Sequence, residues 1–482
     1  MPNVAQLLLS RREDSPGARL GLAGAPMTVA DAVDRAAGLA GTLLDRGLEP
    51  GRPVALIGAN SNDWLITWMA CQLAALPTAL INPSFPDDLL TDVLRPLTPQ
   101  AVLTTDPRPA LAELAERWTS TPDLPRGAGS GPLPGVDARA SDLSAFMLTS
   151  GTSGPPKLVA QSHRYFRSLG RYVADVMGMT ETDTVLSPLP LFHINPLGYA
   201  VLGALTARAN CLSLPRFSAS TFWPQVRDTA ATVAILHGPP LEILKRRTTR
   251  ADAGKHALRA VFYADPEFLS TFDIPLAVTV YGSTEAGGLC HTHLWRRDDT
   301  AEPPEGAVHY GGQHRPGLLH RISDDGEIHI RALEPGLLAD GYVRPGGVVE
   351  SFVRDGWFAT GDLGYDDDHG GLVYLARASE SVRVKGEFVP LGFVEDTFRT
   401  IGTIDDLALW KRPSSLIDEE LVLFIQAATT PLEDIRKTAS ELPSFMRPSA
   451  VARLNALPRD TTVGKTRRRE LDVGNAIEVI EL

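Results

Sequence analysis

Short apolar runs alternate with helical segments along the first hundred residues, and this alternation constrains the fold more than any other feature. Residues 53–58 (PVALIG) form an apolar run between turn residues, as buried parallel strands do. Residues 28–44 carry Ala, Val and Leu at helical spacing, with Thr28 at the N-cap position. Residues 60–76 are again helical in pattern, and residues 101–104 predict another strand. Because parallel strands need crossover connections, the alternation predicts an α/β fold with a parallel sheet.

The alternation resumes after residues 121–141, which are rich in Pro, Gly and Ser and predict a loop or linker. A helix is expected at residues 162–177. Further strands are expected at residues 143–148, 232–236, 258–263 and 276–281. Residues 310–389 are dense in Gly and Asp, with short alternating runs that predict a β-rich region. We therefore expect a large N-terminal domain of parallel-rich sheets, helices and a β-rich subdomain (residues 1–375). A small, mobile α+β domain follows (residues 376–482).

Composition narrows the class of protein. Hydrophobic residues make up 43% of the 482-residue chain and charged residues 22%, which excludes a mainly disordered or fibrous protein. The formal net charge of −12 argues against a nucleic-acid partner, since such binding depends on clustered Lys and Arg. The three cysteines, Cys71, Cys211 and Cys290, lie far apart without zinc-ligand spacing. They predict buried or half-buried thiols in a reducing compartment.

No segment predicts a membrane span or a secretion signal. The most apolar stretch, residues 64–81, is interrupted by Gln72 and Pro77, whereas a spanning helix needs about 20 apolar residues. The first residues lack the basic-then-apolar order of a signal peptide. We expect a cytoplasmic protein.

A glycine-rich loop is the first segment that indicates chemistry. Residues 146–157 read FMLTSGTSGPPK, so a buried strand leads into a loop that ends in Lys157. Exposed backbone N–H groups, hydroxyls and one mobile cation are the groups that hold a polyphosphate. The loop is not a Walker A loop, because Lys157 lies between Pro156 and Leu158. A phosphate site of another kind is predicted, with an ordinary surface loop as the alternative.

Five more segments follow this loop in a fixed order. They are SPLPLFH at 187–193, VYGSTE at 280–285, GWFATGDL at 356–363, LAR at 375–377 and PRDTTVGK at 458–465. Together with the loop they resemble, in order, the motifs of the adenylate-forming enzymes. This superfamily includes acyl-CoA synthetases, nonribosomal-peptide adenylation domains and luciferases. The resemblance covers about two-thirds of the chain, and six matches in order make chance implausible.

The resemblance implies a site for ATP and Mg²⁺. It assigns the phosphates to Thr149, Ser150, Gly151, Thr152, Ser153, Gly154 and Lys157. Thr284 would contact the α-phosphate, and Glu285 would hold Mg²⁺, a cation that prefers oxygen ligands. Tyr281 would pack on the adenine, with Gly282 and Ser283 in the same motif.

Two further pairs complete the expected nucleotide site. Ala264 and Asp265 correspond to the family's adenine-binding turn, although an ordinary turn fits them equally well. Asp362 would accept hydrogen bonds from both ribose hydroxyls, since an ionised carboxylate has two acceptor oxygens. Arg377 would place a cation near the ribose and phosphate.

Two residues are expected beside the reacting carboxylate. By the resemblance, Lys465 bridges the carboxylate and the α-phosphate, and His193 lines the carboxylate pocket. The catalytic set is therefore Lys465, Thr284, Glu285 and His193. Residues 237–240 (HGPP), after an apolar run, are expected to form another pocket wall.

The chain departs from the family at the hinge. Acyl-CoA synthetases usually have Gly-Arg-x-Asp there, and this chain has Ala376-Arg377-Ala378-Ser379. The residues for adenylation are present, so we expect a ligase that converts a small organic acid to acyl-AMP and transfers it to CoA. The alternatives are transfer to a carrier-protein pantetheine arm, or nitrite activation for diazotisation of an aryl amine. An inactive nucleotide-binding protein is the alternative of another class. The basic run at residues 467–469 indicates either a solvated face or a patch for phosphates of the acceptor.

Overall fold

The computed structural model describes most of the chain, as two compact units. The described residues are 2–84, 87–104, 117–120, 133–149, 157–299, 309–378, 382–384, 387–389, 391–413, 419–442, 444, 446–459 and 466–482. Unit 1 comprises Met1–Glu302, Gly311–His320 and His329–Phe358, and unit 2 comprises Pro303–Tyr310, Arg321–Ile328 and Ala359–Leu482. The predicted domain boundary at residues 375 and 376 stays a prediction.

An eight-stranded sheet lies in unit 1, in the order β19-β18-β8-β7-β4-β3-β5-β6. Its strands are β3 Val54–Ile57, β4 Thr78–Ile81, β5 Ala101–Thr104, β6 Arg117–Ser120, β7 Leu143–Thr149, β8 Lys157–Ser162, β18 Gly341–Arg344 and β19 Val348–Glu350. The five strands from β7 to β6 are parallel. Val54 and Leu56 enter one apolar core, while Ala55 and Ile57 enter another. Burial of both faces explains why these strands read as continuous apolar runs.

A second sheet has thirteen strands among the described residues. Nine of them are neighbours in the order β15-β14-β13-β12-β11-β9-β10-β1-β2. They are β1 Arg19–Leu22, β2 Met27–Thr28, β9 Thr184–Ser187, β10 Asn210–Ser213, β11 Val233–Ile235, β12 Ala260–Phe262, β13 Leu276–Tyr281, β14 His291–Arg296 and β15 His309–His314. The strands from β13 to β1 are parallel, and the outer strands on both sides are antiparallel. The predicted α/β class with parallel-rich sheets is therefore confirmed.

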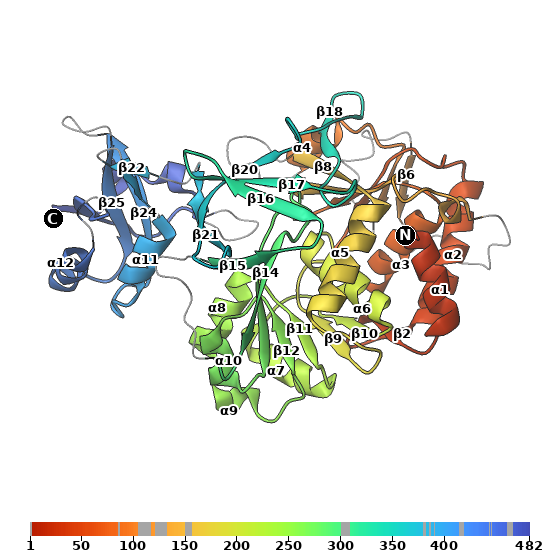
Figure 1. Cartoon of the computed structure of the whole chain (residues 1–482), viewed down its shortest axis with the longest axis horizontal. Coiled ribbons are helices and arrows are strands. Elements are labelled where there is room, and N and C mark those ends of the chain that lie inside the picture. The colour runs from red at the N-terminus through yellow and green to blue at the C-terminus, as the bar shows by residue number, and fades with distance from the viewer. Residues whose placement is uncertain are drawn as a thin grey trace. The chain divides into compact units, whose positions relative to one another are not determined.

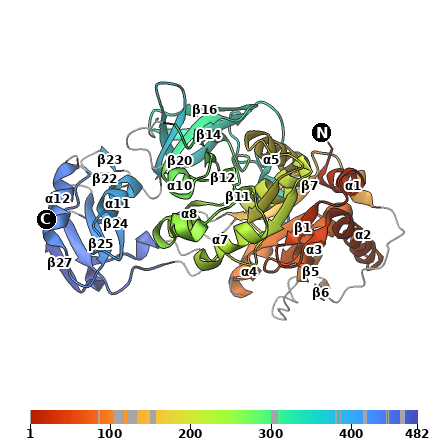
Figure 2. The ribbon, with the colours of Figure 1, turned by 90° about the horizontal axis from the view of Figure 1, so that it is seen from below.

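Helices cover the sheets of unit 1 (Figures 1 and 2). They are α1 Val4–Asp14, α2 Val29–Asp45, α3 Asn62–Leu73, α4 Asp87–Leu94, α5 His163–Val176, α6 Leu202–Ala207, α7 Ala219–Asp228, α8 Gly238–Arg247, α9 Arg250–Ala253 and α10 Pro266–Phe272, with a π-helical segment η4 Asn195–Val201. One large core joins α2, α3 and α5 to strands of both sheets. Thr28 caps α2 by accepting from Asp31 N, as predicted, and Ser162 caps α5 in the same way.

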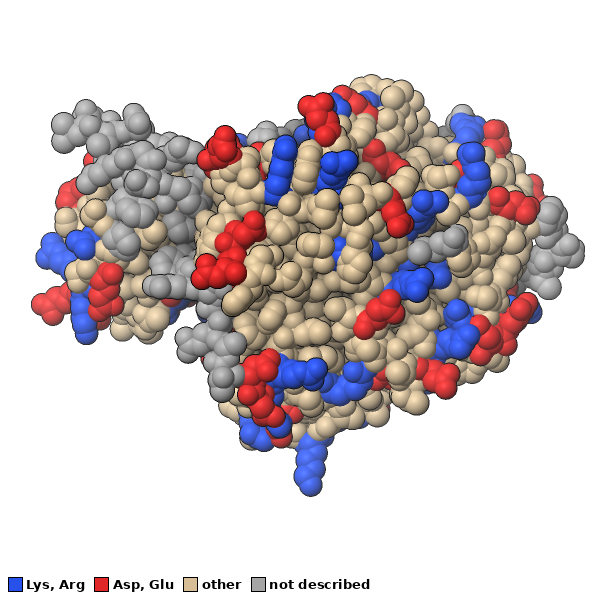
Figure 3. Space-filling model, viewed as in Figure 1, with Lys and Arg blue, Asp and Glu red and all other residues tan. Residues whose placement is uncertain are grey.

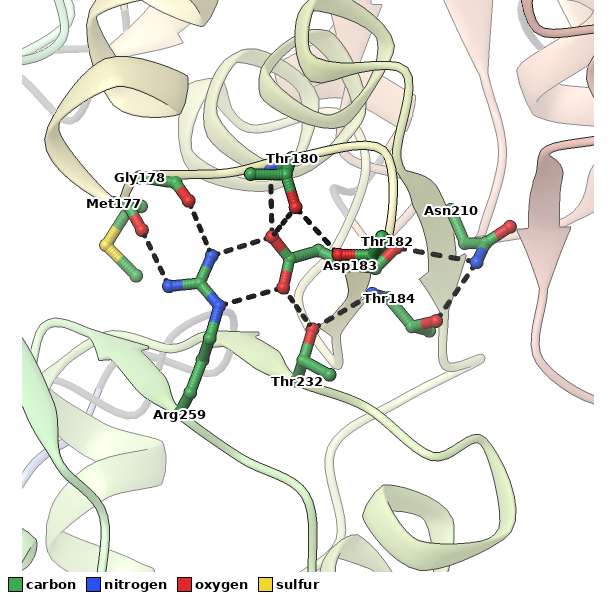
Figure 4. A network of polar contacts seen from close by, with 9 residues as sticks. All are labelled: Met177, Gly178, Thr180, Thr182, Asp183, Thr184, Asn210, Thr232 and Arg259. Atoms are coloured by element: carbon green, nitrogen blue, oxygen red, sulfur yellow. Dashed lines mark hydrogen bonds and ion pairs between the residues drawn. The ribbon is translucent and has the colours of Figure 1, made fainter.

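A buried carboxylate ties three strand ends together (Figure 4). Asp183 accepts hydrogen bonds from Arg259 Nη2 at 2.7 Å, Arg259 Nε at 2.8 Å and Thr232 Oγ1 at 2.7 Å. Arg259 also donates to the carbonyls of Met177 and Gly178. Burial alone would raise the pKa of Asp183, but these hydrogen bonds lower it to about 2. The network fixes the turn before β9 to the residues that precede β11 and β12.

Unit 2 contains the antiparallel pairs β20–β21 and β22–β23 and a four-stranded C-terminal sheet. Its strands are β20 Phe358–Asp366, β21 Leu372–Arg377, β22 Val382–Val384, β23 Glu387–Val389, β24 Asp406–Pro413, β25 Glu419–Gln426, β26 Ala450–Arg453 and β27 Glu478–Glu481. Helices α11 Leu391–Arg399 and α12 Leu432–Glu441 belong to the same apolar core as the last sheet. Four strands have residues in both units: β15, β16 Leu318–Ile322, β17 Glu327–Ala332 and β20.

Carboxylates of unit 2 pair with two members of the basic run at residues 467–469. Arg468 donates to both oxygens of Glu395, at 2.9 and 2.8 Å, and Glu395 is 2% exposed. Arg467 pairs with Glu470 at 2.9 Å. Arg467 and Arg468 therefore have acidic partners inside unit 2, and the predicted phosphate patch stays a prediction.

Surface charges on the face in Figure 3 are mixed in sign. Arg250 and Arg297 both pair with Asp273, and Arg344 pairs with Glu350. The three cysteines are buried, as expected, and burial raises the pKa of Cys71 and Cys211 to about 12. Among the helices that the structure describes, none is long and apolar enough to cross a membrane.

Candidate active site

The tight turn after β13 carries the segment YGSTE, to which the resemblance assigns nucleotide contacts. It lies at the carboxyl end of a parallel strand, where α/β folds place ligand-binding groups. A Cβ atom on Gly282 would lie 2.5 Å from the Gly288 carbonyl oxygen, so only glycine fits there. Gly288 N donates to the Ser283 carbonyl at 2.8 Å, which closes the turn. The motif therefore forms a compact loop around Thr284 and Glu285.

Two tyrosine hydroxyls hold the carbonyls of this loop. Tyr165 of α5 donates to the Thr284 carbonyl at 2.8 Å, and Tyr199 of η4 donates to the Gly288 carbonyl at 2.8 Å. Both tyrosines are almost fully buried. Burial raises the pKa of both phenols, so they remain neutral donors. The loop is thereby fixed to the helical layer of unit 1.

A buried arginine holds the same loop from another direction. Arg315 is 3% exposed, and its Nη1 donates to the carbonyls of Gly287 and Leu289 at 3.3 and 3.4 Å. Its Nη2 donates to Ser168 Oγ, and its guanidinium lies 5.0 Å from the centroid of the Tyr172 ring. Burial lowers the pKa of Arg315. We refer to Tyr165, Tyr199 and Arg315 together as the carbonyl clamp.

Glu285 is a buried carboxylate with one hydrogen-bond donor to its side chain. It is 7% exposed, and Tyr342 Oη donates to Glu285 Oε1 at 3.1 Å. Within the described part of the chain, no Lys or Arg forms an ion pair with it. A buried carboxylate without a cation is costly, and a divalent cation with oxygen ligands would supply the missing charge. The residues therefore fit Mg²⁺.

Glu285 would be one ligand among several. The described residues contain no group of three or more His, Cys, Asp or Glu that could hold a metal ion. Mg²⁺ usually binds through one or two carboxylates together with substrate phosphates and water. The site is thus suited to a metal that arrives with a nucleotide.

The two described ends of the glycine-rich loop are adjacent. Thr149 of β7 pairs in register with Lys157 of β8. The Lys157 ammonium lies 5.1 Å from the centroid of the Tyr342 ring, a cation–π distance. Ser150, Gly151, Thr152, Ser153 and Gly154 lie outside the described residues, as do Lys465 and the hinge residue Ser379. Their predicted roles stay predictions.

His193 lies in a buried polar region next to a second imidazole. Burial and the neighbouring His237 lower the pKa of His193 to about 4, so it is neutral at pH 7. Asn195 Nδ2 donates to the Leu236 carbonyl at 3.1 Å, which connects the two segments. Asn195 begins the π-helical η4, and such turns are frequent at functional sites. His193 and His237 are thus neighbours, and their predicted place at the acid's site stays a prediction.

The residues assigned to the adenine lie at the ends of β12 and β13, and Asp265 already has hydrogen-bond partners within the protein. It caps α10 by accepting from Phe268 N at 2.8 Å, and it accepts from Lys245 Nζ at 3.0 Å. Ala264 and Tyr281 are buried. An adenine contact in this turn would therefore fall to the backbone near Ala264, and the roles assigned to these residues stay predictions.

Unit 2 holds the remaining predicted pair. Asp362 and Arg377 are register partners on β20 and β21, and Arg377 Nη1 lies 2.6 Å from Asp362 Oδ1. The same Nη1 donates to the Thr360 carbonyl at 2.9 Å. The two residues assigned to the ribose side are therefore brought together.

Sequence reasoning missed Tyr342 and the carbonyl clamp. Tyr165 and Tyr199 lie at apolar positions of helical segments, where a tyrosine is expected to be an ordinary core residue. Arg315 lies in a Gly-rich segment, GGQHRPG, without a pattern that predicts burial. A possible signal for Tyr342 is its place directly after Gly341, ahead of the TGD motif.

Comparisons with known proteins agree with the sequence motifs. A family model described as AMP-binding enzyme matches residues 20–336, more than half of the chain. A crotonobetaine/carnitine–CoA ligase of Proteus mirabilis is 28% identical over 363 residues, covering 68% of this chain and 66% of that protein. This chain therefore spans slightly less than two-thirds of that relative. An oxalate–CoA ligase of Arabidopsis thaliana is 26% identical and covers 97% of this chain and 96% of its own length.

Solved structures give the same fold. The o-succinylbenzoate CoA synthetase MenE of Bacillus subtilis, in complex with an acyl-adenylate, has a TM-score of 0.85 at 20% identity, covering 98% of each chain. ATP-bound MatB of Rhodopseudomonas palustris has a TM-score of 0.83 at 24% identity, covering 97% of this chain and 98% of its own. These structures share the fold, and the family model together with the ordered motifs establishes that the chain belongs to the AMP-binding enzyme family of the adenylate-forming superfamily.

Proposed function

We propose that the protein is an ATP-dependent acid–CoA ligase. It joins a small organic acid to AMP, releases pyrophosphate, and transfers the acyl group to CoA. The buried carboxylate of Glu285, without an ion pair among the described residues, carries the proposal. It is a site for a divalent cation in the motif where this family binds ATP. The named activities of the Proteus and Arabidopsis relatives support CoA as the acceptor.

The chemistry requires charge to be neutralised. In the first step, an oxygen of the acid's carboxylate attacks the α-phosphorus, and the bond to the bridging oxygen of pyrophosphate breaks. Both reactants are anions, so cations and fixed donors must face the phosphates. When bound at Glu285, Mg²⁺ would neutralise phosphate oxygens. The carbonyl clamp holds Thr284 and Glu285 in a fixed loop, so little reorganisation is needed.

The remaining assignments follow the motifs. Thr149 and Lys157, at the two ends of the glycine-rich loop, face the distal phosphates, and Thr284 the α-phosphate. Asp362 and Arg377 of unit 2 belong to the ribose. His193 lines the acid's site as a neutral imidazole, which donates or accepts hydrogen bonds without adding charge.

Lys465 is assigned to the carboxylate and α-phosphate oxygens in the transition state. Removing one contact of this kind typically lowers the rate by about 10²–10³. We therefore expect Lys465→Ala to lower acid-dependent ATP–pyrophosphate exchange by that factor, with an unchanged melting temperature. Lys437→Ala, on α12, is the control and is expected to exchange at the wild-type rate. Wild-type exchange by Lys465→Ala would defeat the assignment.

The acceptor is tested by measuring the AMP that is released from ATP in the presence of a panel of acids, with and without CoA. AMP and a thioester that both depend on CoA support the ligase. Formation of AMP with nitrite and an aryl amine, without a thioester, would replace CoA with the diazotisation alternative. Acylation of a pantetheine-loaded carrier protein in preference to CoA would point to the carrier-protein variant.

A further inference from the structure

We propose that Tyr342 is a positioning residue that orients Glu285 for the magnesium ion delivered with ATP. The inference rests on the proposed function in assigning Glu285 to Mg²⁺. It adds a residue to which no motif of the sequence assigned a role. Tyr342 contacts both the carboxylate of Glu285 and the ammonium of Lys157.

The hydroxyl of Tyr342 has a defined partner. Its Oη donates to Glu285 Oε1 at 3.1 Å. Ala339 N, in the segment before β18, donates to the Glu285 carbonyl at 3.0 Å. The residues around the start of β18 therefore hold both the backbone and the side chain of Glu285.

The ring of Tyr342 is fixed by its neighbours. Tyr342 pairs in register with Val159 of β8, and its ring centroid lies 5.2 Å from that of Phe352. The Lys157 ammonium lies 5.1 Å from the same ring. Gly341 before it has φ +155°, and a Cβ there would lie 2.3 Å from the Glu350 carbonyl oxygen. Because the strand and ring are held, the hydroxyl has little freedom to turn away from Glu285.

A phenol is well suited to this position. It orients the carboxylate through a neutral donor, so the negative charge that attracts Mg²⁺ is kept. A Lys or Arg in its place would cancel that charge. Loss of the hydroxyl would let the carboxylate rotate and leave one buried lone pair without a donor. Tyr342 therefore acts on the metal through Glu285 rather than by touching ATP.

The test measures how strongly Mg²⁺ tightens ATP binding. Isothermal titration calorimetry gives the Kd for ATP in EDTA and in saturating Mg²⁺, and their ratio is the magnesium effect. We expect Tyr342→Phe to reduce this ratio about tenfold, which corresponds to the free energy of one hydrogen bond to a charged group. The Kd in EDTA should stay unchanged. Tyr342→Leu, which also removes the ring, should show at least the same loss.

Two controls separate positioning from a general structural role. Tyr310→Phe removes a hydroxyl that bonds Asp367 at 2.6 Å in unit 2, and it should keep the wild-type ratio. In a Glu285→Gln background, Tyr342→Phe should have no further effect, since the hydroxyl acts through the carboxylate. Circular dichroism confirms that each variant is folded.

The outcomes are distinct from those of the proposed function. A wild-type ratio in folded Tyr342→Phe or Tyr342→Leu would overturn the inference, and so would an equal loss in Tyr310→Phe. Full additivity with Glu285→Gln would also overturn it. If no acid yields AMP but Tyr342→Phe still loses the magnesium effect, the positioning role stands and the proposed reaction fails.

Discussion

Buried imidazoles couple the stability of unit 1 to pH. Burial lowers the pKa of His163 to about 4, although the neighbouring Asp142 acts in the opposite direction. His193 is lowered to about 4 as well. The ordinary histidine value is 6.5, so the unfolded state binds more protons between pH 6.5 and 4. The stabilisation is complete above pH 6.5 and is lost as the pH falls toward 4.

His163→Gln tests this linkage at a residue outside the site. A shift from 6.5 to about 4 corresponds to about 3 kcal/mol of free energy of unfolding. We expect the variant to lose less stability than the wild type between pH 6.5 and 4, whatever its stability at pH 8. Urea denaturation at several pH values measures the slope. Parallel curves for the two proteins would contradict the prediction.

The hydrogen bonds of Asp183 differ in charge, so we expect their loss to cost different amounts of stability. Arg259→Leu leaves the buried carboxylate without its cation, and breaking such a pair typically costs about 3 kcal/mol. Thr232→Val removes one neutral donor and should cost about 1 kcal/mol. Chemical denaturation at pH 7 gives both values. Equal losses would mean that the ion pair is not what holds the turn.

Motif residues could be proposed from the sequence because each motif couples residue type to position. Glu285, Asp362, Arg377 and His193 all follow from short contiguous patterns. Tyr342 contacts Glu285 from 57 positions along the chain, and a contact of that kind leaves no local pattern. The engagement of Asp265 by Lys245 was hidden for the same reason.

Among the structural elements, the loop after β13 is closely constrained by its backbone contacts. Gly287 has φ +79°, and a Cβ on it would lie 2.3 Å from the Leu337 carbonyl oxygen. We expect Gly287→Ala to destabilise the fold by more than 2 kcal/mol, since it adds a backbone clash to the cost of the left-handed conformation, which alone is about 1–2 kcal/mol.

The matched control is Gly346→Ala, at φ +83° with no atom within 4 Å of the added Cβ. It should cost only the conformational term, about 1 kcal/mol. Thermal unfolding of both variants measures the difference. If Gly287→Ala is as stable as Gly346→Ala, the loop is looser than its contacts imply.

Strands and helices were predicted most accurately where their pattern was local. Residues 101–104 coincide with β5 and residues 276–281 with β13. The helix predicted at 60–76 is shorter, because Ser61 caps α3 at its start and the helix ends at Leu73. Strand β6 was missed, and the pairing of β18 with β8 could not be foreseen, since it joins segments that are distant in sequence.

At the scale of the whole molecule, the net charge of −12 limits where an anionic substrate can bind. On the face in Figure 3, basic and acidic residues are interspersed, and Arg250, Arg297 and Arg344 each pair with a carboxylate. Cations beside the candidate motifs include Lys157, which lies over an aromatic ring, and Arg377, which pairs with Asp362. A divalent ion at Glu285 would therefore contribute much of the positive charge that ATP requires.

The most direct test follows the oxygen of the substrate. An acid that supports AMP release is labelled with ¹⁸O in its carboxylate, and the products are examined by mass spectrometry. Attack of the carboxylate on the α-phosphorus transfers one labelled oxygen to AMP, so the account predicts AMP that carries a single ¹⁸O and unlabelled pyrophosphate. Unlabelled AMP, or ADP with labelled inorganic phosphate, would contradict acyl-adenylate formation.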